Sequence, residues 1–146
     1  MSTTMPGRLS GFPFVFLQEV RFRDLDMLGH VNNAVYATYF ESARIAYYCD
    51  LTGQRLEELN IILAEMTISF RAPAQFGDEL GIGVRIGRIG TKSFTMEYVA
   101  VRLNDDVLIA DGSSVQVAFD YRSNASIPLT EEFRRLVQDR QEIKKA

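Results

Sequence analysis

The residues best suited to chemistry gather in one short stretch that holds Asp24, Asp26, His30, Asn32 and Asn33. A segment with helical spacing follows, so this stretch leads into a helix N-terminus. A helix N-terminus carries free backbone N–H groups and partial positive charge, which stabilise an oxyanion developing on a carbonyl. A carboxylate just before it could attack that carbonyl or activate water beside it.

A purely structural role also suits these residue types. Asp, Gly and Asn are favoured in any strand-to-helix loop, because their side chains accept hydrogen bonds from nearby backbone groups. Residue types and spacing therefore leave both interpretations open.

The sequence does not match other common catalytic or cofactor-binding motifs. The run from Gly81 to Gly87 resembles a dinucleotide fingerprint, but its third glycine comes one position late and strand-like residues surround it. The sequence has no phosphate loop and no Gly-x-Ser-x-Gly elbow. With one His and one Cys, we expect no metal site.

The elements that position the stretch can be read from periodicity. Residues 12–23 are rich in β-branched and aromatic types, which predicts a strand ended by the acidic loop 24–29. The main helix is predicted from Tyr36 to Cys49, which contains no Gly or Pro. Asn33 is its expected N-cap and Gly53 its expected stop.

After an expected helical turn at residues 55–59, alternation with period two predicts four strands, around residues 66–70, 80–86, 94–98 and 115–121. Short links with turn residues make neighbouring strands antiparallel. Thr130 before two glutamates predicts a last helix that reaches about Gln141. The fold class is therefore α+β, a five-stranded antiparallel sheet packed on one long helix, with a C-terminal helix.

Length and composition limit the remaining possibilities. The 146 residues suit one domain, with residues 1–11 expected as a flexible arm. A net charge of −3 gives no field that attracts nucleic acid or an anionic membrane, so neither is an expected partner. The single Cys49 and the lack of a secretory signal or spanning segment favour the cytoplasm. One helix cannot cover five strands, so we expect self-association.

The run Asp-x-Asp-x-x-Gly-His-Val-Asn-Asn, followed by Tyr-x-x-Tyr-Phe-Glu-x-Ala-Arg, resembles the hot-dog-fold thioesterases of the 4-hydroxybenzoyl-CoA thioesterase and YbgC-like group. Weaker likenesses extend through Arg71-x-Pro73, Gly77-Asp78-Glu79-Leu80, Lys92-Ser93-Phe94 and Ala110-Asp111-Gly112. The resemblance covers nearly everything after the first dozen residues.

The resemblance implies that Asp26 is the nucleophile or general base of an acyl-CoA thioesterase and that Asp24 supports it. The backbone amide at Asn33 would polarise the thioester carbonyl. For the side chains of His30, Asn32 and Asn33, loop hydrogen bonds remain an equal alternative, and His30 would orient rather than react. Glu41 and Arg44, three apart on the helix, are expected to form an ion pair.

The resemblance also implies a substrate and an assembly. The CoA moiety would contact Lys92, with Arg88 and Ser93 beside it, although a solvated turn explains these residues as well. Acyl carrier protein thioesters remain possible substrates, and no cofactor is needed. The protein would be a homodimer or a dimer of dimers with its active site at the subunit interface. A hot-dog hydratase or dehydratase and a non-catalytic acyl-CoA-binding protein stay open as alternatives.

Overall fold

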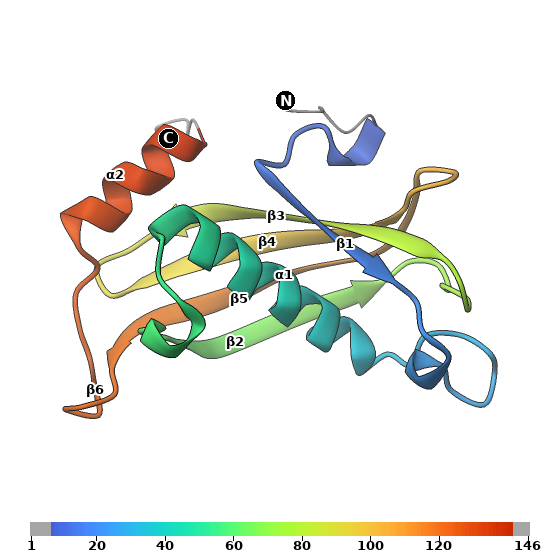
Figure 1. The fold of residues 1–146 in the computed structure, drawn as a ribbon, viewed down its shortest axis with the longest axis horizontal. Helices are drawn as coiled ribbons and strands as arrows, with labels where there is room; N and C mark the ends of the chain where they lie inside the picture. The colour runs from blue at the N-terminus through green and yellow to red at the C-terminus, as the bar shows by residue number, and fades with distance from the viewer. Residues whose placement is uncertain (1–6, 142–146) are drawn as a thin grey trace.

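The computed structural model describes residues 7–141 and contains a curled antiparallel sheet with one long helix lying across it (Figure 1). The helices are α1 (Val35–Thr52) and α2 (Glu131–Arg140), with short 3-10 turns at Gly7–Leu9, Phe22–Asp24 and Leu56–Glu58. The strands are β1 (Phe14–Glu19), β2 (Ile61–Phe70), β3 (Glu79–Ile89), β4 (Ser93–Arg102), β5 (Val107–Asp120) and β6 (Ala125–Ser126).

The spatial order of the strands is β1-β3-β4-β5-β2, and all neighbouring pairs are antiparallel. The two-residue strand β6, which periodicity did not reveal, pairs with the end of β5. The predicted α+β fold class, with one sheet on one long helix and a C-terminal helix, is confirmed.

The core lies between α1 and the sheet. Tyr39, Phe40 and Tyr47 of α1 are buried, as expected for residues on one helical face. The Phe40 ring stacks on Tyr98 of β4, with centroids 4.9 Å apart. Alternate residues of β3 face the same core: Leu80, Ile82, Val84 and Ile86. The period-two pattern therefore identified the buried face of this strand correctly.

The predicted ion pair between Glu41 and Arg44 is present at 3.8 Å. Arg44 is nevertheless buried, and it also donates a hydrogen bond to the Tyr98 hydroxyl at 3.2 Å. Arg44 therefore links the exposed Glu41 to the buried Tyr98 hydroxyl in the core.

Three local predictions need correction. The first strand ends at Glu19 and not at residue 23, because Asp24 accepts a hydrogen bond from the Arg21 backbone and the chain turns there. The residue at the N-cap of α1 is Ala34 and not Asn33. The arm expected over residues 1–11 is docked from residue 7, since Leu9 is buried and Arg8 donates to the Asp106 carbonyl at 3.0 Å. Residues 1–6 lie outside the described chain.

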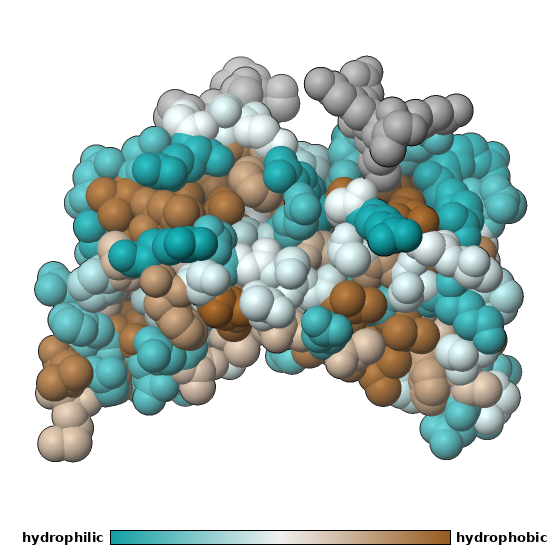
Figure 2. Space-filling model, turned by 180° about the vertical axis from the view of Figure 1, so that it is seen from behind, coloured by the Kyte–Doolittle hydropathy of each residue, from teal (hydrophilic) through white to brown (hydrophobic). Residues whose placement is uncertain are grey.

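The sheet presents one mixed face and two edge strands, β1 and β2. Viewed from behind, hydrophilic and hydrophobic residues are interspersed on the side away from α1 (Figure 2). β2 forms one edge of the sheet, and its Ile62, Leu63 and Phe70 side chains are exposed. Edge strands with exposed apolar residues are prone to pair with another chain. Among the described residues, no helix is long and apolar enough to cross a bilayer.

The close packing of β5 against β2 and α1 can be tested at Gly112. A Cβ there would clash with the Thr67 backbone oxygen of β2 and lie 3.3 Å from the Phe40 ring of α1. We therefore expect Gly112→Ala to lower the free energy of unfolding by about 1–3 kcal/mol, measured in urea. Gly11→Ala is the matched control, because a Cβ at Gly11 meets no atom within 4 Å. Equal stability of the two variants would contradict this packing.

Candidate active site

The loop between β1 and α1 is a small hairpin that carries the predicted site residues. Isolated bridges join Leu25 to Val31 and His30 to Gln75, and the Asp26 N–H donates to the His30 carbonyl at 2.8 Å. At the hairpin tip, Gly29 adopts a φ of 81°, a left-handed conformation that glycine tolerates without steric cost. The backbone of Asp26 is therefore held by hydrogen bonding to the returning arm of the loop.

Asp24 anchors this hairpin to α1. Its carboxylate is buried and accepts hydrogen bonds from the Tyr39 hydroxyl at 2.6 Å and from the Arg21 backbone N–H at 2.9 Å. Its carbonyl accepts from the Asn32 N–H at 2.9 Å. Burial acts to raise the pKa of Asp24, but the hydrogen bonds from Tyr39 and Arg21 outweigh it and hold that pKa below its usual value.

A cavity of about 340 Å³ opens between this loop, the first turn of α1 and the end of β2. Three of the four predicted catalytic residues line it, namely Asp26, His30 and Asn33. Asn32 does not line it, and its side-chain oxygen accepts a hydrogen bond from the Ala34 N–H at 3.0 Å. For Asn32, the structural interpretation is therefore the one that the geometry supports.

The polar groups of Asp26 and Asn33 differ in whether they already have hydrogen-bond partners. One oxygen of Asp26, Oδ1, accepts from the Leu28 N–H at 2.8 Å, and Oδ2 has no hydrogen-bond partner among the described residues. The Asn33 N–H likewise has no acceptor within residues 7–141. Two residues that line the cavity next to the start of α1, Asp26 and Asn33, thus each keep one polar group without a partner among the described residues.

Sequence reasoning missed three residues that line the cavity, which are Tyr36, Phe70 and Arg71. Tyr36 was identified only as a position on the buried helix face, and burial raises its pKa to about 12. Arg71 pairs with Asp111 of β5 at 3.3 Å. The signal was available, because Arg71-x-Pro73 and Ala110-Asp111-Gly112 both belong to the stretches of family likeness.

The predicted CoA-binding residues lie elsewhere. Arg88 is exposed near the end of β3, Lys92 is exposed in the connection between β3 and β4, and Ser93 begins β4. This connection lies beside α2, which packs near the C-terminal end of α1 (Figure 1). The cavity with Asp26 lies at the N-terminal end of α1. Within one chain, the two groups of residues do not meet.

Comparison with known proteins identifies the family. The model of the thioesterase-like superfamily matches residues 20–137. A thioesterase from Thermus thermophilus, crystallised with coenzyme A and Zn, is 36% identical with a TM-score of 0.84, covering 92% of this chain and 98% of its own.

Two characterised relatives agree with this match. The long-chain acyl-CoA thioesterase FadM of Escherichia coli is 25% identical over 119 residues, 80% of this chain and 90% of FadM. The chloroplastic acyl-acyl carrier protein thioesterase ATL3 of Arabidopsis thaliana is 31% identical over 112 residues, which are 71% of this chain and 58% of ATL3.

The architecture is the hot-dog fold, as its resemblance to that group implied. The chain belongs to the thioesterase-like superfamily, and its class of reaction is thioester hydrolysis.

The anchoring role of Asp24 predicts a pH-dependent loss of stability. Asp24→Asn replaces charge-assisted hydrogen bonds with neutral ones, so the free energy of unfolding at pH 7 should fall by about 1.5–3 kcal/mol. Because the folded state holds the Asp24 pKa below its ordinary value of 3.8, this stabilisation is complete above that value and fades as pH falls through the folded pKa.

Urea unfolding of both proteins between pH 7 and pH 3 measures this effect. The gap between wild type and Asp24→Asn should narrow below about pH 4. A gap that stayed constant over this range would show that the charge of Asp24 does not contribute.

Proposed function

We propose that the protein hydrolyses acyl-CoA thioesters to the free acid and CoA, with Asp26 as the catalytic carboxylate. The observation that carries this proposal is the cavity at the start of α1 that Asp26 and Asn33 both line, where Asp26 Oδ2 and the Asn33 N–H have no hydrogen-bond partner among the described residues. The motif supports placement in the 4-hydroxybenzoyl-CoA thioesterase and YbgC-like group.

In this mechanism, the thioester carbonyl oxygen accepts a hydrogen bond from the Asn33 N–H. Negative charge that develops on that oxygen is stabilised by the donor and by the partial positive charge at the start of α1. The carbonyl carbon then lies within reach of the free oxygen of Asp26. In this mechanism, the Asn33 N–H polarises the carbonyl, the Asp26 carboxylate acts beside it, and one water is consumed.

Two routes are open to the Asp26 carboxylate. As a nucleophile, it forms a mixed anhydride and expels the CoA thiolate, which takes a proton from solvent, and water then cleaves the anhydride. As a general base, it takes a proton from the water that attacks the carbonyl, the C–S bond then breaks, and the departing CoA thiolate takes that proton from Asp26. Either route ends in one carboxylic acid and one thiol.

The walls of the cavity suit an acyl group. Leu28, Val31, Tyr36 and Phe70 contribute apolar surface beside Asp26. Phe70 is about half exposed at 48%, so a bound acyl chain would cover it.

CoA is the carrier that the relatives support best. The Thermus structure contains coenzyme A, and FadM acts on acyl-CoA, whereas ATL3 is named for acyl carrier protein thioesters. Lys92 and Arg88 supply exposed cations for the phosphates of CoA, with Ser93 beside them. A cytoplasmic location, expected from the sequence, stays a prediction.

A homodimer would let both groups of residues act on one substrate. If β2 pairs antiparallel with its copy about a two-fold axis, the Phe70 end of one strand meets the Ile61 end of the other. Phe70, at the first of these ends, lines the cavity with Asp26. Lys92 lies toward the second end, because its carbonyl accepts from the N–H of Ala118, the residue that pairs with Ile61. The exposed side chains of Ile62, Leu63 and Phe70 support this pairing.

The catalytic role is tested by Asp26→Asn. The Asn oxygen can still accept from the Leu28 N–H, so the melting temperature should stay near that of wild type. Loss of the charge should lower kcat on acyl-CoA by roughly a hundredfold or more, with KM little changed.

Steady-state release of free CoA measures this, and chromatography of the products separates hydrolysis from hydration of the acyl chain or from binding alone. Asn32→Asp, which keeps a capping oxygen outside the cavity, is the control and should retain most activity. Near-normal turnover in Asp26→Asn would refute the assignment.

The shared dimer site is tested by combining two impaired chains. Lys92→Ala should raise KM for acyl-CoA severalfold, more at low salt than at high salt, and should affect a thioester without the nucleotide much less. A purified heterodimer of Lys92→Ala and Asp26→Asn chains should regain one complete site and outperform both parent proteins at low substrate concentration. Light scattering that gives a monomer, or a heterodimer no better than the mean of its parents, would contradict the shared site.

A further inference from the structure

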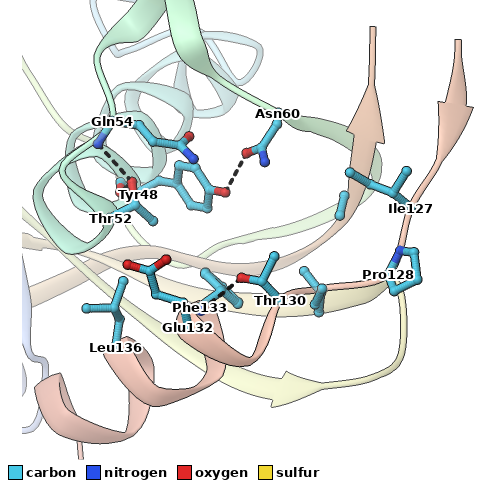
Figure 3. A pocket seen from close by; sticks show the side chains of 12 residues that line it. Tyr48, Thr52, Gln54, Asn60, Ile127, Pro128, Thr130, Glu132, Phe133 and Leu136 are labelled. Carbon is cyan, nitrogen blue, oxygen red and sulfur yellow. Dashed lines mark hydrogen bonds between the residues drawn. The ribbon is translucent and has the colours of Figure 1, made fainter. Parts of the chain in front are cut away.

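A second cavity, of about 170 Å³, lies at the other end of α1, between the C-terminal turn of that helix, the start of β2 and α2 (Figure 3). It is smaller than the roughly 300–1,000 Å³ of pockets that take a whole drug-sized ligand. It is larger than the ~30 Å³ that one water occupies in the liquid. Its size therefore suits a single chemical group of a larger molecule.

The walls of this second cavity are aromatic and apolar. The rings of Tyr48 and Phe133 have centroids 5.9 Å apart with an interplanar angle of 39°, and both side chains are buried. Pro128 and Leu136 add to the apolar lining. Such surfaces favour a flat ring system, which gains contact area by packing against them.

Two amide side chains supply a hydrogen-bond acceptor and a donor. The Gln54 Oε1 atom is buried and has no hydrogen-bond partner among the described residues. Asn60 accepts from the Tyr48 hydroxyl at 2.8 Å through its oxygen, which leaves its NH₂ group free to donate. Figure 3 shows the ends of these two side chains close to the Tyr48 hydroxyl. A buried acceptor without a partner is costly, so the site favours a ligand that donates to it.

The charge of the lining excludes phosphate from the cavity itself. Within the described chain, Glu132 is the charged residue of this lining, and no Lys or Arg contributes to it. The backbone of Lys92 lies next to this lining, because its carbonyl accepts from the N–H of Ala118 at 2.8 Å, and Ala118 lines the cavity. The Lys92 side chain is exposed, so it is available to phosphates outside the cavity. A nucleotide would fit this arrangement, because its uncharged base would lie inside the cavity and its phosphates would lie outside.

We propose that this second cavity binds the adenine base of the CoA substrate. The exocyclic amine of adenine donates to Gln54 Oε1, and a ring nitrogen accepts from the Asn60 NH₂ group, a pairing of donor and acceptor that amide side chains commonly make with adenine. The base packs against Tyr48 and Phe133, and the phosphates remain with Lys92 and Arg88. The inference rests on the proposed acyl-CoA substrate and assigns its nucleotide end.

The first experiment needs no variant. Calorimetry compares binding of adenosine 3′,5′-bisphosphate and inosine 3′,5′-bisphosphate to wild-type protein, since the second replaces the exocyclic amine with an oxygen that faces Gln54 Oε1. We expect the adenine nucleotide to bind at least about tenfold more tightly, because the buried acceptor is left unpaired by the other base.

Gln54→Met then removes the acceptor at similar volume. It should abolish the preference for adenine and raise KM for acyl-CoA more than KM for the matching acyl-N-acetylcysteamine, which has no nucleotide. Gln138→Met, on the exposed side of α2 and away from the cavity lining, should keep the preference.

The outcomes separate this inference from the proposed function. Equal binding of the two nucleotides by wild type would overturn the adenine site even if acyl-CoA were hydrolysed normally. Loss of the preference in Gln138→Met as well as Gln54→Met would also overturn it. A preference that depends on Gln54, in a protein that hydrolyses no acyl-CoA, would retain the base-binding cavity and reject the proposed reaction.

Discussion

The hydrogen bond from the Tyr39 hydroxyl to the buried Asp24 carboxylate is the contact on which the site depends. It joins the second turn of α1 to the loop that follows β1, and the same carboxylate closes the turn at Arg21. The Asp24 carbonyl then fixes Asn32 on the returning strand of the loop. One residue thus sets the position of both strands of the hairpin relative to α1. The cavity beside Asn33 exists only while that arrangement is kept.

In the proposed mechanism, Asp24 has a structural role and Asp26, two positions later, has the chemical one. Asp24 is buried with its carboxylate fully engaged, which suits an anchor and excludes a reacting group. Asp26 is exposed at the cavity and uses one oxygen to accept from Leu28, so its orientation is fixed while its other oxygen stays free. Attack on a carbonyl, or removal of a proton from the water beside it, requires a carboxylate that has a fixed orientation and one oxygen without a hydrogen-bond donor.

Sequence reasoning succeeded where the information is local. Periodicity identified α1 and the four later strands, and Gly53 was correctly identified as the stop of α1, where its φ is 74°. Predictions failed where contacts between segments far apart in the sequence determine the structure. The end of β1 depends on the Asp24 contacts, and the lining of the active-site cavity by Phe70 and Arg71 depends on the register of β2 against β5, neither of which a local pattern encodes. The family motif predicts Asp26 as the catalytic carboxylate, but only the coordinates show that Lys92 lies toward the opposite end of α1, beside Ala118.

The central claim is that the Asn33 N–H and the Asp26 side chain face the same thioester carbonyl. The most direct test is a crystal structure of the Asp26→Asn protein with an intact acyl-CoA bound. The account predicts that the thioester oxygen lies within hydrogen-bond distance of the Asn33 nitrogen, about 2.7–3.2 Å, with the side chain of residue 26 next to the carbonyl carbon. A thioester bound away from the first turn of α1, or oriented with its carbonyl oxygen toward solvent, would contradict the account.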